Sequence, residues 1–244
     1  MTPAVEKAAR RILLGIGELH GLHISVVTAA NLASGLGTGL RCVVVEHGDL
    51  LAVAGLPFSR AVGRGGISSP MTLQLMESYF RNLSRAVERE LIETCARLNI
   101  DWALARPSGQ YVEELSAAAE GGDIIVVSRR DIAAVPGELL KTARRLLEKA
   151  AAIVVPAIKQ DHGGAVLAFT TPENGRDAQA LAVEIATALR APLEIMDFTD
   201  FPLTRRKAAI VVAPLALAEA TGERLFLQRI DAMGAGAVLV PGKT

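Results

Sequence analysis

The sequence of 244 residues has few aromatic side chains, two cysteines and no net charge. Phe, Trp and Tyr make up 4% of the chain, so we expect a core built from aliphatic side chains. Two cysteines without a CxxC pair exclude a disulfide scaffold and fit a reducing compartment. The 26 basic and 26 acidic residues cancel, which removes the main electrostatic reason to expect a nucleic-acid partner.

Long apolar runs and targeting patterns are also scarce. The longest uncharged stretch, Leu19–Leu40, is long enough to span a membrane, but histidines, hydroxyl side chains and four glycines interrupt it. Residues 1–10 lack the apolar run of a signal peptide. We therefore expect a cytoplasmic protein without membrane insertion, and its length allows one large domain or two smaller ones.

Short apolar segments rich in β-branched residues recur along the chain and alternate with helical patterns. Such segments are typical of strands buried on both faces, as in an open parallel sheet covered by helices, so the predicted fold class is α/β. The predicted strands are Ile12–Ile16, Cys42–Glu46, Asp101–Ala105, Ile124–Ser128, Ile153–Ala157, Val166–Phe169, Leu193–Phe198, Ala209–Ala213 and Val238–Val240.

Helices are predicted between these strands. Residues 20–36 include His23–Thr28, which has strand propensity, but a parallel sheet needs a crossover there, so we predict a helix. A long amphipathic helix is predicted between Pro70 and Leu98, with Ser69 as its N-cap and Pro70 in its first position. Further helices are predicted at Gln110–Glu120, Glu138–Ala150, Arg176–Arg190 and Gly222–Met233.

An internal repeat divides the chain at the polar linker Lys159–Gly164. The first half ends in DIIVVS, a helix and AAIVVPA, and the second half ends in AAIVVAP, a helix and GAVLVPG. The second copy lacks a long helix and one strand. The predicted domains are therefore a complete unit at residues 1–158 and a reduced one at 165–244.

The order of these elements resembles the universal stress protein family, with two domains in tandem. The resemblance rests on RRILLGI, on RCVVVEHGDLLAVAGLPF after the first helix, and on GGDIIVVSRR followed by LLEKAAAIVVP; LLAVAGLPF is similar to a bacterial subset. It implies a flavodoxin-like, adenine nucleotide alpha-hydrolase-like sheet with strand order 3-2-1-4-5 and a ligand cleft at the carboxyl ends of the strands. It also implies that Ile153–Val155 and Val238–Val240 pair within the chain, with a homodimer as a further assembly.

Family members that bind ATP have an acidic residue after the first strand and a G-x-x-G, nine residues, G-[S/T] pattern after the fourth. The first position corresponds here to Gly17, with Glu18 beside it, and the glycines correspond to Ser128, Asp131 and Lys141–Thr142. The phosphate-approaching glycines are therefore replaced, although arginine and lysine side chains could supply positive charge instead. The candidate ligand-contacting residues are Gly17, Glu18, Ser128, Arg129, Arg130, Lys141 and Thr142.

No motif assembles a nucleophile, a base and an oxyanion site, and no complete metal-ligand spacing is present. The resemblance then implies a non-catalytic stress-response or regulatory protein with a degenerate nucleotide site, acting through protein contacts or weak ligand sensing. It identifies no certain cofactor, and ATP is the candidate. The alternatives are an ATP or AMP sensor with slow hydrolysis that uses Arg129, Arg130 and Thr142, and a cytosolic regulatory module of a membrane transporter.

Overall fold

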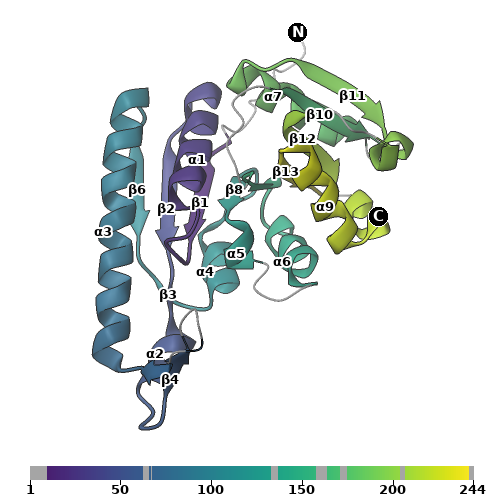
Figure 1. Cartoon of the computed structure of the whole chain (residues 1–244). Coiled ribbons are helices and arrows are strands. Elements are labelled where there is room, and N and C mark those ends of the chain that lie inside the picture. Colours follow the sequence, from purple (N-terminus) through teal and green to yellow (C-terminus); the bar gives the residue numbers. More distant parts are fainter. Residues whose placement is uncertain are drawn as a thin grey trace.

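The computed structural model describes residues 10–62, 66, 68–132, 137–157, 164–170, 175–203 and 207–241. A single large sheet runs through the molecule and carries helices on both faces (Figure 1). This is the α/β architecture that the sequence predicts.

Residues 10–157, called here the N-terminal part, contain the first fifteen elements. In chain order they are β1 (Ile12–Ile16), α1 (Leu22–Leu36), β2 (Leu40–Val44), β3 (Glu46–His47), α2 (Gly48–Ala54), β4 (Arg60–Val62), β5 (Ser68–Pro70), α3 (Leu73–Leu98), β6 (Trp102–Ala105), β7 (Ser108–Gly109), α4 (Tyr111–Ala118), β8 (Ile124–Val127), α5 (Arg129–Ile132), α6 (Glu138–Leu147) and β9 (Ala152–Val155).

Residues 164–241, called here the C-terminal part, contain the remaining elements. They are β10 (Ala165–Thr170), α7 (Gly175–Leu189), β11 (Leu193–Asp197), the 3-10 helix η1 (Phe198–Leu203), β12 (Ala208–Pro214), α8 (Leu215–Thr221), α9 (Glu223–Met233) and β13 (Gly236–Val240).

The large sheet has the strand order β11-β10-β12-β13-β9-β8-β1-β2-β6. Within the N-terminal part the strands are parallel, and their order along the sheet is 3-2-1-4-5 when counted along the chain. The four strands of the C-terminal part have the order 2-1-3-4 when counted along the chain. They correspond to strands 2-1-4-5 of the N-terminal part, because η1 stands where a third strand and its helix would be. The two parts meet where β13 pairs antiparallel with β9, so that Val238 lies opposite Val154. This pairing confirms the predicted contact between the two final strands.

Two apolar layers hold the sheet between its helices. Helices α1, α3 and α7 pack on one face, and α4, α5, α6, α8 and α9 pack on the other. Strand side chains alternate between the layers, so Leu14 belongs to the first and Leu13 to the second. Both are buried, which explains why the central strands are continuous apolar runs.

Helix α1 confirms the prediction that topology overrides strand propensity at residues 20–36. Its small and branched side chains, including Val26, Ala29 and Ala33, are fully buried against the sheet. Gly21 and Gly37 bracket the helix with φ values of 76° and 64°, which favour glycine.

The predicted start of the long helix is wrong. Ser68–Pro70 form strand β5, which pairs antiparallel with Arg60–Val62, so the helix cannot begin at Pro70. Thr72 is the N-cap instead, and its hydroxyl accepts a hydrogen bond of 3.2 Å from the backbone N–H of Leu75. Helices α2 and α8 were not predicted. The predicted linker Lys159–Gly164, apart from Gly164, lies outside the described residues.

Candidate functional site

The segments that follow the neighbouring strands β8, β1 and β2 meet at the carboxyl ends of these strands, which form one end of the sheet. Gly17 and Glu18 follow β1, His47 ends the short strand β3 after β2, and Asp131 lies in α5 after β8. The carboxyl ends of parallel strands are where ligands bind in open α/β sheets. These residues therefore form the candidate site at the carboxyl ends of the strands, where the family resemblance predicts the ligand cleft.

Three side chains converge on the α-carbon of Gly17. A Cβ at this position would lie 2.8 Å from Oδ1 of Asp131, 3.0 Å from Nε2 of His47 and 3.3 Å from Cδ2 of Tyr111. The imidazole of His47 stacks on the ring of Tyr111, with centroids 6.1 Å apart. The space beside the end of β1 is thus occupied by the protein's own side chains.

Burial dominates the electrostatics of Asp131. Burial, together with the smaller effect of the nearby carboxylate of Glu18, raises the pKa of Asp131 from 3.8 to about 7. Hydrogen bonds from Ser128, from the backbone of Gly17 and from Tyr111 favour the ionised form but do not outweigh burial. The hydroxyl of Tyr111 donates to Oδ2 at 3.4 Å. Asp131 consequently exchanges its proton near neutral pH.

The two aromatic neighbours favour their neutral forms. Burial raises the pKa of Tyr111 well above 10, with the charge of Asp131 adding to the effect, and burial lowers the pKa of His47 below 6.5. Asp131 has the pKa of a general acid or base. His47 and Tyr111, however, fill the place beside it where a reacting group would stand.

Glu18 adds a second carboxylate to the same edge. Its Oε1 is buried and has no hydrogen-bond partner among the described residues, and the nearest cation in an ion pair is Nε of Arg130, at 3.9 Å. The side chain of Arg130 is about half exposed. The structure therefore brings together four predicted site residues, namely Gly17, Glu18, Ser128 and Arg130.

Arg129 points away from this group and toward the C-terminal part. Its two terminal nitrogens donate hydrogen bonds of 2.8 Å each to the two carboxylate oxygens of Asp231 in α9. A bidentate pair of this kind occupies the guanidinium face that a phosphate would use.

A carboxylate from α9 also occupies the N-terminus of α6, the helix that follows the loop after β8. The Glu223 side chain accepts hydrogen bonds from the backbone N–H groups of Gly137 at 2.8 Å and Leu140 at 3.0 Å. Free N–H groups at a helix start attract anions, and here an internal carboxylate satisfies them. Glu223 therefore stands in a place suited to a phosphate.

The last two predicted site residues lie inside α6 rather than at its start. Lys141 is exposed and pairs with Glu138 at 2.9 Å, while Thr142 is buried among apolar side chains of the helix layer. Gly137, with a φ of 90°, marks the true helix start. The glycine before the amphipathic pattern of Glu138–Ala150 was the signal for it. His47, Tyr111 and Glu223 were not predicted, because only the fold brings them to this edge.

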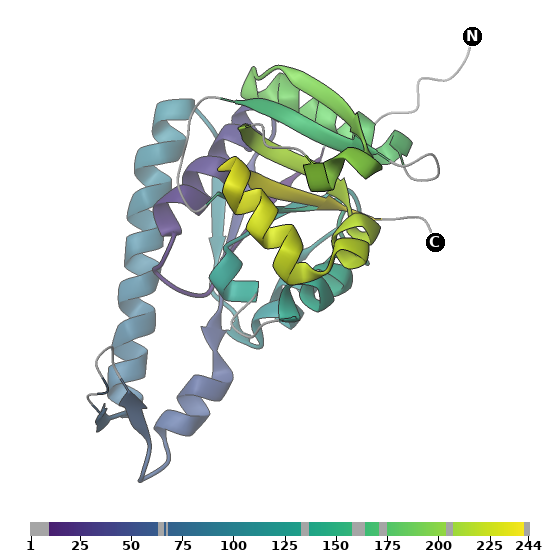
Figure 2. The same cartoon turned by 45° about the vertical axis from the view of Figure 1, so that its right-hand side comes forward.

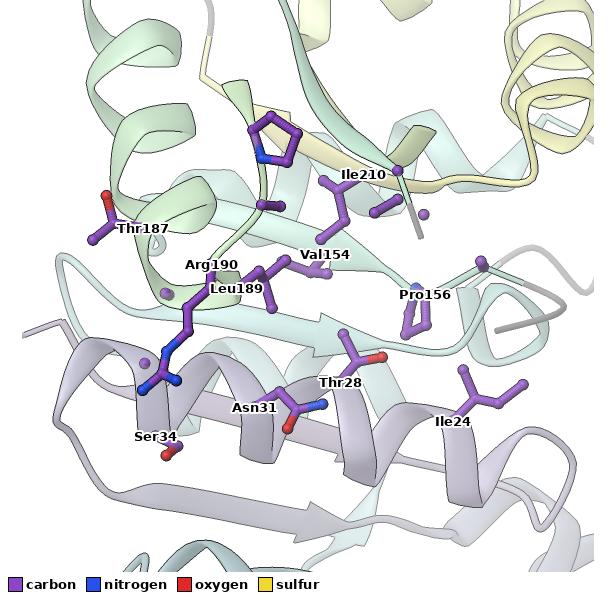
Figure 3. A pocket seen from close by; sticks show the side chains of 18 of the residues that line it. Ile24, Thr28, Asn31, Ser34, Val154, Pro156, Thr187, Leu189, Arg190 and Ile210 are labelled. Atoms are coloured by element: carbon purple, nitrogen blue, oxygen red, sulfur yellow. The ribbon is translucent and has the colours of Figure 1, made fainter. Parts of the chain in front are cut away.

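A separate cavity of about 860 Å³ lies between α1 and α7, over the seam where β9 and β13 meet (Figure 3). It shares no lining residue with the site described above. Thr28, Asn31 and Ser34 face it from α1, and the Arg190 side chain reaches toward them from the end of α7 (Figure 3). Arg190 is the one charged residue among the described residues of this lining. The cavity has the size of a small-molecule pocket, and the part of its lining that the structure describes offers no pair of groups for acid–base chemistry.

The described residues offer neither a cluster of metal ligands nor a helix suited to a membrane. No three His, Cys, Asp or Glu side chains among them lie where they could share a metal ion. None of the described helices combines the length and the apolar character needed to cross a membrane.

The fold is similar to that of a solved universal stress protein. The structure is similar to the crystal structure of a universal stress protein from Archaeoglobus fulgidus DSM 4304, with a TM-score of 0.57. The match covers 95% of this chain and 96% of that chain at 11% sequence identity, so it shows the fold alone. No family model matches the sequence, and no curated protein matches it.

Proposed function

We propose that this chain is a cytoplasmic, bacterial regulatory protein of the universal stress type, built from two tandem domains at residues 1–158 and 165–244. In this proposal it catalyses no reaction, and its nucleotide site is degenerate. It acts through protein contacts or weak ligand sensing.

The observation that carries this proposal is the filled space beside Gly17. Asp131, His47 and Tyr111 stand within 3.3 Å of where a Cβ of Gly17 would be, so a base entering there would have to displace them. Two of the groups that would neutralise phosphates are engaged as well, since Arg129 binds Asp231 and the start of α6 binds Glu223. Two carboxylates, Glu18 and Asp131, would also repel a polyphosphate.

A thermal-shift titration with ATP, ADP and AMP, each with and without Mg²⁺, tests the proposal. A ligand that binds only the folded state at about 100 times its Kd adds about 2.7 kcal/mol of stability. For a chain of this size that corresponds to a rise in Tm of roughly 5–10 °C. We expect no rise in Tm with millimolar nucleotide. A clear rise in Tm with ATP would contradict the proposal that the nucleotide site is degenerate.

The alternative, an adenine-nucleotide sensor, is favoured by one feature. The buried Oε1 of Glu18 has no hydrogen-bond donor among the described residues, and an adenine amino group could supply one. Under this alternative AMP raises the Tm, Glu18→Ala abolishes the rise, and Glu148→Ala, a change at an exposed glutamate, leaves it intact. A membrane-transporter module remains a third proposal, for which co-purification with a membrane protein is the test.

A further inference from the structure

Exposed apolar side chains gather on one projection of the molecule. The segment 48–75 is called here the arm. Its described residues, 48–62, 66 and 68–75, comprise α2, β4, β5 and the first residues of α3, and these elements extend away from the sheet in both views (Figures 1 and 2). Of the twelve large apolar side chains that are exposed in the described part of the chain, seven lie on the arm: Leu50, Val53, Leu56, Phe58, Val62, Leu73 and Leu75.

Phe58 and Val62 are the most exposed of these, at 91% and 71%. With ordinary side-chain areas, the seven residues together expose roughly 700 Å² of largely apolar surface, summed over the arm. Each partner contributes about 800 Å² to a standard protein interface. The arm therefore has about the apolar surface that one partner needs.

The hairpin of the arm has no core of its own. Strands β4 and β5 pair antiparallel, with Val62 opposite Ser68, yet none of their six residues is buried. A two-stranded hairpin without packing is marginally stable in water. Pro70 lacks the N–H that pairing on β5 would use, so β4 is the better edge for a further strand.

The charges of the arm indicate which partner fits it. Residues 48–75 contain three charged residues among 28, namely Asp49, Arg60 and Arg64. Arg60 is already engaged, because its guanidinium donates to the hydroxyl of Ser68 at 2.7 Å and to its carbonyl at 3.0 Å. The arm thus carries no cluster of charges of one sign that would attract an acidic or basic partner. Two arms would therefore not repel each other.

We propose that the arm binds the arm of a second copy of this chain across a two-fold axis. In this dimer β4 pairs antiparallel with β4 of the other copy, and Phe58 and Val62 lie at the centre of the contact. An isologous contact satisfies the open edge and covers the apolar side chains of both copies at once. The inference goes beyond the proposed function and does not depend on nucleotide binding, so the two can fail separately.

Sedimentation equilibrium of the full chain without nucleotide, from about 1 to about 100 μM, measures this association. We expect a mass twice the 25.7 kDa of the chain. Phe58→Asp and Val62→Asp should each raise the dimer Kd at least about 30-fold, since they place charge at the centre of the contact. Because both side chains are exposed, circular dichroism should show unchanged folding.

Ile195→Asp is the matched control, because Ile195 is a 48% exposed apolar residue on β11, at the far edge of the large sheet. It should leave the Kd unchanged. A wild-type chain that stays monomeric at about 100 μM overturns the proposal and points to a different partner for the arm. A dimer that Ile195→Asp disrupts and Phe58→Asp does not also overturns it.

Cross-linking through one introduced cysteine gives an independent test of the arm-to-arm contact. The native Cys42 and Cys95 are buried, so an introduced thiol is the reactive one. Val62→Cys should form a disulfide-linked dimer under mild oxidation, and Ile195→Cys should not. The reverse pattern would contradict the proposed contact.

Discussion

The guanidinium of Arg129 lies against the carboxylate of Asp231, with two hydrogen bonds of 2.8 Å, and joins helix α5, which follows β8, to helix α9. The residues are 102 positions apart in the sequence. A second contact between the same regions is the capping of α6 by Glu223. The acidic side chains of α9 thus occupy the groups of the N-terminal part that could hold an anion.

A double-mutant cycle should detect this pair in the free energy of unfolding. The side chains are 23% and 41% exposed, so we expect a coupling energy of about 0.5–1 kcal/mol between Arg129→Ala and Asp231→Ala. Urea denaturation of the four proteins measures it. The pair Arg106 and Glu88, both 45% exposed, is the matched control and should show a smaller coupling. Equal coupling energies for the two pairs would mean that the bidentate geometry of Arg129 and Asp231 adds nothing to stability.

Asp131 should make stability fall as the pH rises toward neutrality. Between its ordinary pKa of 3.8 and its folded pKa of about 7, the folded state keeps a proton that the unfolded chain releases. The free energy of unfolding therefore decreases by up to about 1.4 kcal/mol per pH unit in this range and levels off above it. Asp131→Asn cannot titrate, so its stability relative to wild type should increase by about 2–4 kcal/mol from about pH 4 to pH 7.

Chemical denaturation across the pH range measures this difference, in which the contribution of His47 cancels because both proteins contain it. Asp197→Asn is the control. Hydrogen bonds from Thr199 lower the pKa of Asp197, so its contribution is lost only as the pH falls below about 4. Its difference curve should be flat above about pH 5. A flat curve for Asp131→Asn over the same range would contradict the raised pKa.

Gly17→Ala should destabilise the fold, because the new methyl group would overlap Asp131 and His47. We expect a loss of about 1–3 kcal/mol, as for overpacking in a dense site. The loss should shrink in an Asp131→Ala background, which opens space for the methyl group. Gly121→Ala is the control, since a Cβ there meets nothing within 4 Å and should change stability by less than about 1 kcal/mol. Equal effects at both glycines would show that the space beside Gly17 is open.

Arg190→Gly should stabilise the protein. Arg190 follows α7 with a φ of 51°, a left-handed conformation that glycine adopts without strain. We expect the free energy of unfolding to rise by about 0.5–1 kcal/mol in urea denaturation. Arg190→Ala removes the side chain but keeps the strain, so it should not stabilise. A gain in both variants would assign the effect to the guanidinium beside the cavity instead.

Much of the fold could be predicted because local pattern and tertiary position agree. The central strands are continuous apolar runs, and Ile12–Ile16 matches β1 residue for residue. The prediction of secondary structure was wrong where a segment has few packing contacts with the rest of the protein. Ser69 and Pro70 have good helix-start chemistry, yet they pair with β4 on the arm, and a hairpin of exposed residues leaves no apolar alternation to read.

The candidate site was only partly predictable. Gly17, Glu18 and Ser128 could be found because the pattern of the resembled family is counted from recognisable strands, and Arg130 lies next to those positions. His47 reaches Gly17 from strand β3 and Tyr111 from helix α4, and no spacing in the sequence encodes that meeting. Arg129 illustrates the limit most clearly, since its residue type is suited to a phosphate but its neighbour is Asp231.

The sequence by itself determined the class of fold and the buried strands, because burial on both faces leaves continuous apolar runs, and the family resemblance indicated the edge where their carboxyl ends gather. The tertiary structure decided which groups remain available at that edge. Side chains from distant elements fill the space beside Gly17, and carboxylates from α9 bind Arg129 and the start of α6. These outcomes depend on distances between elements far apart in the chain, which a linear pattern of residue types does not contain.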